Sequence, residues 1–328
     1  MCAPTNSRWR TSDGHGAGAP PTRAPGAGTL ALLAMVWLLA MVTSARFTVG
    51  DSPPLTPVTL ARIALEFPQL VAATLVAGAA IGLAAVNLLG RRAGPVRERL
   101  APRLAVSTAA GLALGTALAV VIAVGYGTLP AVGELAGTLA ATGALGGLLA
   151  GVRHRAVLAA GVAGALAAFA ARFVAGVFDA DLQTLFGARD TAESLLTAST
   201  WVVLSVAVVA GAAGGAIGYV YLRRGGSSGV GWPGYLVAGA VPGLLALLAE
   251  VATQIGGARL FQLLGQLSPD ERVVQEFLTT TRLNHALVVL FVGALVAIVL
   301  LGRTMPARAA GPADEAAGPA DQETQSTS

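Results

Sequence analysis

Two charged side chains lie inside long apolar stretches of this 328-residue chain. Arg172 stands about five residues before the end of one stretch, and Glu250 stands a similar distance before the end of another. A charge removed from water is costly unless an opposite charge compensates it. We therefore expect an ion pair between Arg172 and Glu250. The alternative is that each side chain extends along its own helix toward water and binds nothing.

Further polar residues stand near these two charges at helical spacing. Thr253 and Gln254 follow Glu250 by three and four residues, so the three side chains share one face of a helix. His285 begins another apolar stretch. The sequence thus predicts that this polar face lines a cavity within the apolar region. The candidate site consists of Arg172, Glu250, Thr253, Gln254 and His285.

Several other kinds of chemistry are disfavoured by the residues present. The chain contains no lysine, so the glycine-rich segment 225–229 lacks the lysine that a phosphate-binding P-loop needs. None of His15, His154 and His285 has a second ligand at helical spacing, so we expect no metal site. Cys2 is the only cysteine, which excludes an internal disulfide. No serine has a nearby base and acid, so we expect no enzyme and no cofactor.

The composition explains which elements must position the candidate residues. Hydrophobic residues make up 55% of the chain, charged residues make up 12%, and the mean hydropathy is +0.71. A helix needs about 20 apolar residues to cross a bilayer. The sequence therefore predicts an all-α, polytopic transmembrane bundle. Its eight predicted spans are 29–45, 68–89, 104–126, 132–152, 156–177, 198–222, 235–255 and 283–301. The first is longer than the core of a signal peptide, which is about 7–15 residues, so we expect it to be retained.

The positions of the arginines predict the orientation of these spans. All 21 cationic residues are arginine, and 14 of them fall in the N-terminal tail, the C-terminal segment and alternate loops. The opposite loops hold six, including Arg282, and Arg172 lies within a span. The positive-inside rule then puts both termini in the cytoplasm of a bacterial plasma membrane, with Arg172 and Glu250 in the outer half. The net charge of +4 is explained by these helix-end arginines, so we expect no nucleic-acid partner.

The remaining sequence divides into two tails and four helical hairpins. Residues 1–28 and 304–328 have the polar, Gly/Pro-rich composition of disordered cytoplasmic tails, and 29–303 form the transmembrane domain. Proline and side-chain acceptors near 56, 190 and 268 predict a short helix at the outer end of three hairpins. An offset of 78 residues aligns Arg172 with Glu250 and Gly187 with Gly265, which suggests a duplicated hairpin.

Two classes of function agree with these features. The first is a transporter or permease-like protein that moves a small solute or a lipid through the polar cluster. The second is a membrane-complex subunit that does not transport and that docks a partner membrane protein through its tails or its arginine-rich second loop. The lipid bilayer is a partner in both. The sequence favours the first, because its intramembrane polar residues gather in one leaflet.

Overall fold

The structure is a computed structural model that describes residues 26–49, 57–92, 100–125, 131–152, 154–189, 191–225, 230–267 and 269–304. Both predicted tails therefore lie almost entirely outside the described residues. The described part of the chain is helical throughout, and eight of its helices are long and apolar enough to cross a membrane. This confirms the predicted fold class of a polytopic transmembrane helix bundle.

Ten helices follow one another along the described chain, and all but the short α6 and α9 are candidate spans. Their bounds are α1 Ala27–Val49, α2 Pro57–Arg92, α3 Leu100–Gly125, α4 Val132–Ala150, α5 Arg155–Val177, α6 Asp179–Leu185, α7 Ala192–Arg224, α8 Trp232–Gly256, α9 Ala258–Leu267 and α10 Pro269–Thr304.

Three spans begin well before their predicted first residue. α2 begins at Pro57 and continues through Pro68, although Pro68 has no N–H to bond to the carbonyl of Ala64. α7 begins at Ala192, and the hydroxyl of its N-cap residue Thr191 accepts a hydrogen bond from the N–H of Ser194. α10 begins at Pro269 rather than at residue 283, because the predicted short outer helix and the span form one continuous helix. This extension places Arg282 inside a helix instead of in a loop.

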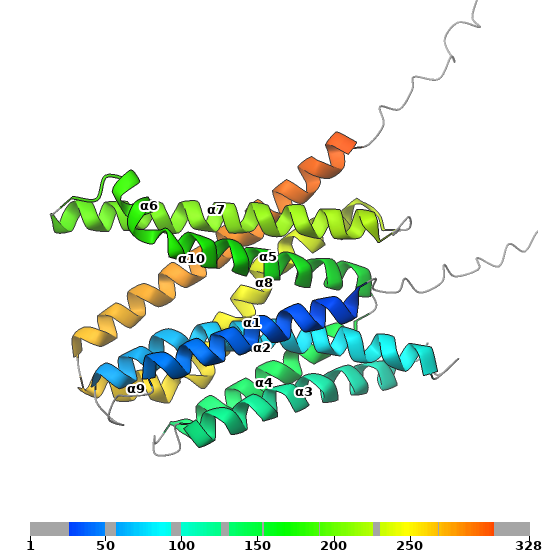
Figure 1. Ribbon diagram of the computed structural model, residues 1–328, viewed down its shortest axis with the longest axis horizontal. Helices are drawn as coiled ribbons and strands as arrows, with labels where there is room; N and C mark the ends of the chain where they lie inside the picture. Colours follow the sequence, from blue (N-terminus) through cyan, green and yellow to red (C-terminus); the bar gives the residue numbers. More distant parts are fainter. Residues whose placement is uncertain are drawn as a thin grey trace, which may run out of the picture.

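The helices pack in two groups that meet through α2 and α8 (Figure 1). α2 packs on α1, α3 and α4, and its side chains are the most buried of any span. α10 crosses the second group and packs on both α7 and α8. The first residue of α1 and the last residue of α10 lie toward the same end of the bundle, as an even number of crossings requires (Figure 1).

Glycines bring the helices of the second group into backbone contact. A Cβ added to Gly239 of α8 or to Gly215 of α7 would lie 2.3 Å from the carbonyl oxygen of Gly293 in α10. A Cβ added to Gly243 of α8 would lie 2.3 Å from the backbone nitrogen of Leu290. These distances are far below van der Waals contact, so only glycine allows the three helices to approach this closely.

The C-terminal end of α10 is also bonded to α7. The hydroxyl groups of Tyr219 and Thr304 lie 2.6 Å apart, and Arg223 donates a hydrogen bond of 2.5 Å to the Tyr219 hydroxyl. The guanidinium of Arg223 also lies 5.9 Å from the centre of the Tyr219 ring, within cation–π range. α10 is therefore bonded to α7 near its last residue, Thr304.

Candidate functional site

Glu250 is the centre of a polar network between α8 and α10. Its side chain is 5% exposed, and its Oε2 lies 3.0 Å from the Nε of Arg282. A second contact of 3.5 Å joins Arg282 Nη2 to Glu250 Oε1. The carboxylate and the guanidinium thus meet through two pairs of atoms. Such charge-assisted pairing is what permits a buried carboxylate to remain inside a helix bundle.

Two uncharged side chains complete this network. Gln254 donates from Nε2 to Glu250 Oε1 at 2.7 Å and also lies 3.0 Å from the hydroxyl of Thr279. Arg282 Nη2 donates to the same hydroxyl at 3.2 Å. The four side chains therefore form a closed set of hydrogen bonds that links one face of α8 to one face of α10. We call Glu250, Gln254, Thr279 and Arg282 the Glu250–Arg282 network.

The glycine contacts explain why these side chains meet. α8 and α10 are antiparallel, and they touch through their backbones at Gly243 and Leu290. Glu250 lies seven residues after Gly243, and Arg282 lies eight residues before Leu290. Both are therefore about two helical turns from the contact, in the same direction along the bundle. The close approach at the glycines keeps the helices near enough for the two side chains to reach each other.

The predicted partner of Glu250 was wrong. Arg172 forms no ion pair with any residue that the structure describes, whereas Glu250 pairs with Arg282. The physical reason is the early start of α10, which brings Arg282 onto the α8-facing side of the bundle. Arg282 was interpreted as a loop residue because apolar residues dominate only from Leu283 onward. Its spacing of three residues from Thr279 and from His285 could have indicated a polar helical face.

The other predicted residues occupy different surroundings. Thr253 is completely buried, but its hydroxyl donates to the carbonyl of Ala249 in its own helix at 2.8 Å. His285 is half-buried beside the backbone of Val203 in α7 and within electrostatic range of Arg172. Arg172 is exposed and is itself within electrostatic range of Arg282. The structure thus brings together Glu250 and Gln254, and it places Arg172 and His285 on the neighbouring α5–α7 side.

Gln275 continues the polar face of α10 toward the N-terminus of this helix. It precedes Thr279 by four residues and Arg282 by seven, so the three share one helical face. Its side chain is 7% exposed, and neither its Nε2 nor its Oε1 has a hydrogen-bond partner among the described residues. Buried amides nearly always have partners, so this position calls for a water molecule or a polar ligand. Sequence reasoning missed Gln275 because it lies outside the predicted span.

Glu134 forms an exposed ion pair, unlike the buried carboxylate of Glu250. It lies in the first turn of α4, 3.2 Å from Arg259 of α9, and both side chains are about half exposed. Exposed ion pairs contribute about 0–1 kcal/mol. We therefore expect Glu134→Gln to change the free energy of unfolding by less than about 1 kcal/mol. Unfolding in mixed detergent micelles measures this value, and a larger loss would show that the pair is structurally important.

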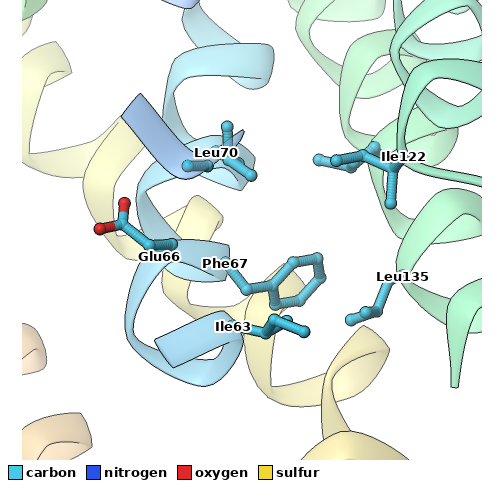
Figure 2. Close-up of a pocket in the computed structure, with 8 residues that line it drawn as sticks. Ile63, Glu66, Phe67, Leu70, Ile122 and Leu135 are labelled. Carbon is cyan, nitrogen blue, oxygen red and sulfur yellow. The ribbon is translucent and has the colours of Figure 1, made fainter. Parts of the chain in front are cut away.

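A small cavity lies elsewhere in the bundle, between α2 and its neighbours in the first group (Figure 2). Its volume of about 20 Å³ is about that of one water molecule. Its lining consists of Ala45, Ile63, Glu66, Phe67, Leu70, Ile122, Leu135 and Leu139. The Glu66 carboxylate points away from the apolar side chains of Ile122 and Leu135 (Figure 2). Glu250 does not line this cavity. The cavity is therefore not the one that the sequence predicts beside the polar cluster.

The described residues contain no group of three His, Cys, Asp or Glu side chains close enough to hold a metal ion. Comparison with known protein families, with curated proteins and with solved structures finds no match to this chain. The Glu250–Arg282 network and its surroundings are therefore the features of the described residues that bear on function.

Proposed function

We propose that this chain is a transport protein that moves a small solute or a lipid across a bacterial plasma membrane, with both termini in the cytoplasm and with no catalytic step. The main observation behind this proposal is the ion pair between the buried Glu250 and the part-buried Arg282, which lie in the candidate spans α8 and α10. Charges inside a membrane are costly, and they are typically retained at substrate or ion pathways. The arginine-rich alternate loops support the orientation.

The neighbouring helix geometry supports a site that opens and closes. Pro242 lies inside α8, two turns before Glu250, and it removes a backbone hydrogen bond there. α8 continues through Pro242 as one helix, and a proline inside a helix is a position where the helix can bend. In this proposal the Glu250–Arg282 pair closes the outer side of the pathway, and its opening admits the substrate.

Alternating exposure of buried positions tests this proposal. Cys2 is replaced by Ser, and single cysteines are then introduced at Thr253 and, as a matched control, at Thr74. Both threonines are fully buried, and each donates to the carbonyl four residues earlier in its own helix. We expect Thr253→Cys to react with a membrane-impermeant thiol reagent added outside intact cells, and Thr74→Cys to stay unreactive. Ala238→Cys, fully buried toward the other end of α8, should react from the cytoplasmic side in inside-out vesicles.

The second candidate function is a membrane-complex subunit that does not transport. It is favoured by the small size of the described cavity, which has no room for a solute. If neither Thr253→Cys nor Ala238→Cys reacts from its respective side, the transport proposal is wrong. The second candidate then predicts that a partner membrane protein co-purifies in mild detergent and is lost when residues 1–28, 93–99 or 304–328 are deleted.

A further inference from the structure

Arg172 stands at the point where a packed face of α5 becomes exposed. Gly161 of this face contacts Val241 of α8, and Ala165 and Ala168 farther along it are buried. Arg172 follows Ala168 by four residues and continues the same face, yet it is exposed. The helices that cover the inner part of this face therefore leave its outer part accessible to the membrane.

The charges around this position do not balance. Arg172 and Arg282 are within electrostatic range of each other, and His285 is within electrostatic range of Arg172. Among the described residues, Glu250 is the only carboxylate paired with this group, and it pairs with Arg282 alone. Two guanidinium groups thus lie near a single carboxylate that neutralises only one of them, so this part of the bundle has an excess of positive charge. A second anion would remove the mismatch.

Arg282 has hydrogen-bond donors that the Glu250–Arg282 network does not use. Its Nε and Nη2 bond to Glu250 and Thr279, while its Nη1 makes no hydrogen bond with any described residue. The whole guanidinium of Arg172 is available to bind a ligand, because no described residue forms an ion pair with it. Arginine binds phosphate well because its planar N–H groups match two phosphate oxygens.

We propose that Arg172, with Arg282 beside it, binds the phosphate group of an anionic lipid from the outer leaflet. Arg172 is five residues before Val177, the last residue of α5, so its Cα lies about 8 Å from the helix end. A long arginine side chain spans most of this distance, which brings its guanidinium to the level of the headgroups. Its exposure lets a lipid arrive sideways from the bilayer, whereas a free anion must come from water.

This inference goes beyond the proposed transport function, and lipid binding is measured without transport; only the choice of the outer leaflet rests on the proposed orientation of the chain. The full-length protein is purified in a nonionic detergent, and its unfolding temperature is followed against added ligand. The probes are dihexanoyl phosphatidylglycerol, which is anionic, dihexanoyl phosphatidylcholine, which is zwitterionic, and sodium phosphate. We expect phosphatidylglycerol to bind the wild-type protein at least tenfold more tightly than phosphatidylcholine.

Three variants identify the residue responsible. Arg172→Gln should abolish the preference for phosphatidylglycerol, and Arg172→Lys should retain part of it because lysine keeps the charge but not the planar donors. Arg259→Gln is the control, because Arg259 is an exposed arginine already paired with Glu134. Equal binding of both lipids to the wild-type protein, or an unchanged preference in Arg172→Gln, would overturn the inference. Sodium phosphate binding as tightly as phosphatidylglycerol would overturn the lipid assignment. An Arg172-dependent preference in a protein whose Thr253→Cys variant stays unlabelled would separate the two proposals.

Discussion

Glu250→Ala should destabilise the protein by about 3–5 kcal/mol, which is the cost of removing one partner from a buried ion pair. The mutation leaves the Arg282 guanidinium without its carboxylate between α8 and α10, and it also removes the acceptor of the 2.7 Å bond from Gln254. Unfolding in mixed detergent micelles gives the change in free energy. A loss below 1 kcal/mol would mean that the pair contributes little to the folded state.

A double-mutant cycle identifies the partner of Glu250. Combining Glu250→Ala with Arg282→Ala should give a coupling free energy of up to about 3 kcal/mol, because the two side chains share one network. Combining Glu250→Ala with Arg172→Ala should give effects that add within about 0.5 kcal/mol. A stronger coupling to Arg172 than to Arg282 would contradict the geometry and restore the pairing expected from the sequence.

Gly293→Leu should lower the free energy of unfolding by as much as Glu250→Ala or more. The backbone of Gly293 is in contact with Gly215 of α7 and Gly239 of α8, so a side chain there must push three helices apart. Overpacking of a tight core costs about 1–3 kcal/mol, and a clash with backbone atoms places this substitution at the upper limit or beyond. We expect little folded protein in membranes and a strongly lowered unfolding temperature in detergent.

Gly137→Leu is the matched control for this substitution. Gly137 also lies within a spanning helix, α4, but a Cβ built on it has no atom within 4 Å. Leucine favours helix over glycine by roughly 0.5–1 kcal/mol, so this variant should be as stable as the wild-type protein or slightly more stable. Equal behaviour of the two leucine variants would show that the α7–α8–α10 contact is looser than the structure indicates.

The number and the helical type of the membrane spans could be predicted because length and hydropathy decide them locally. Each span contains about 20 mostly apolar residues, and a helix satisfies its backbone hydrogen bonds within the span, so it needs no backbone partner in lipid. The short helices α6 and α9 were not predicted, and the separate short helices predicted near 56, 190 and 268 are instead continuous with α2, α7 and α10. The starts of α2 and α10 could not be predicted from hydropathy, since their first turns contain polar residues that extend beyond the apolar core. Helix continuity there depends on backbone hydrogen bonding rather than on burial.

The site could be predicted only in part, for a related reason. Glu250 and Gln254 share a face through local spacing, so the sequence contains that information. The choice of Arg282 over Arg172 depends on which helix packs against α8, and this is decided by distant contacts such as Gly243 with Leu290. An unpaired carboxylate in a span indicates that some cation must approach it, without indicating which one.

α10 changes its neighbours along its length, and this has a mechanical consequence. It is bonded to α7 near Thr304, touches both α7 and α8 by its backbone at Gly293, and is bonded to α8 near Arg282. These three contacts prevent α10 from sliding along its neighbours. If the contact near Thr304 or the one near Arg282 is lost, α10 can tilt about Gly293. Removing the hydrogen bond between Tyr219 and Thr304 would therefore change the position of Arg282 relative to Glu250. This effect would act through about 20 residues of helix, from Thr304 to Arg282.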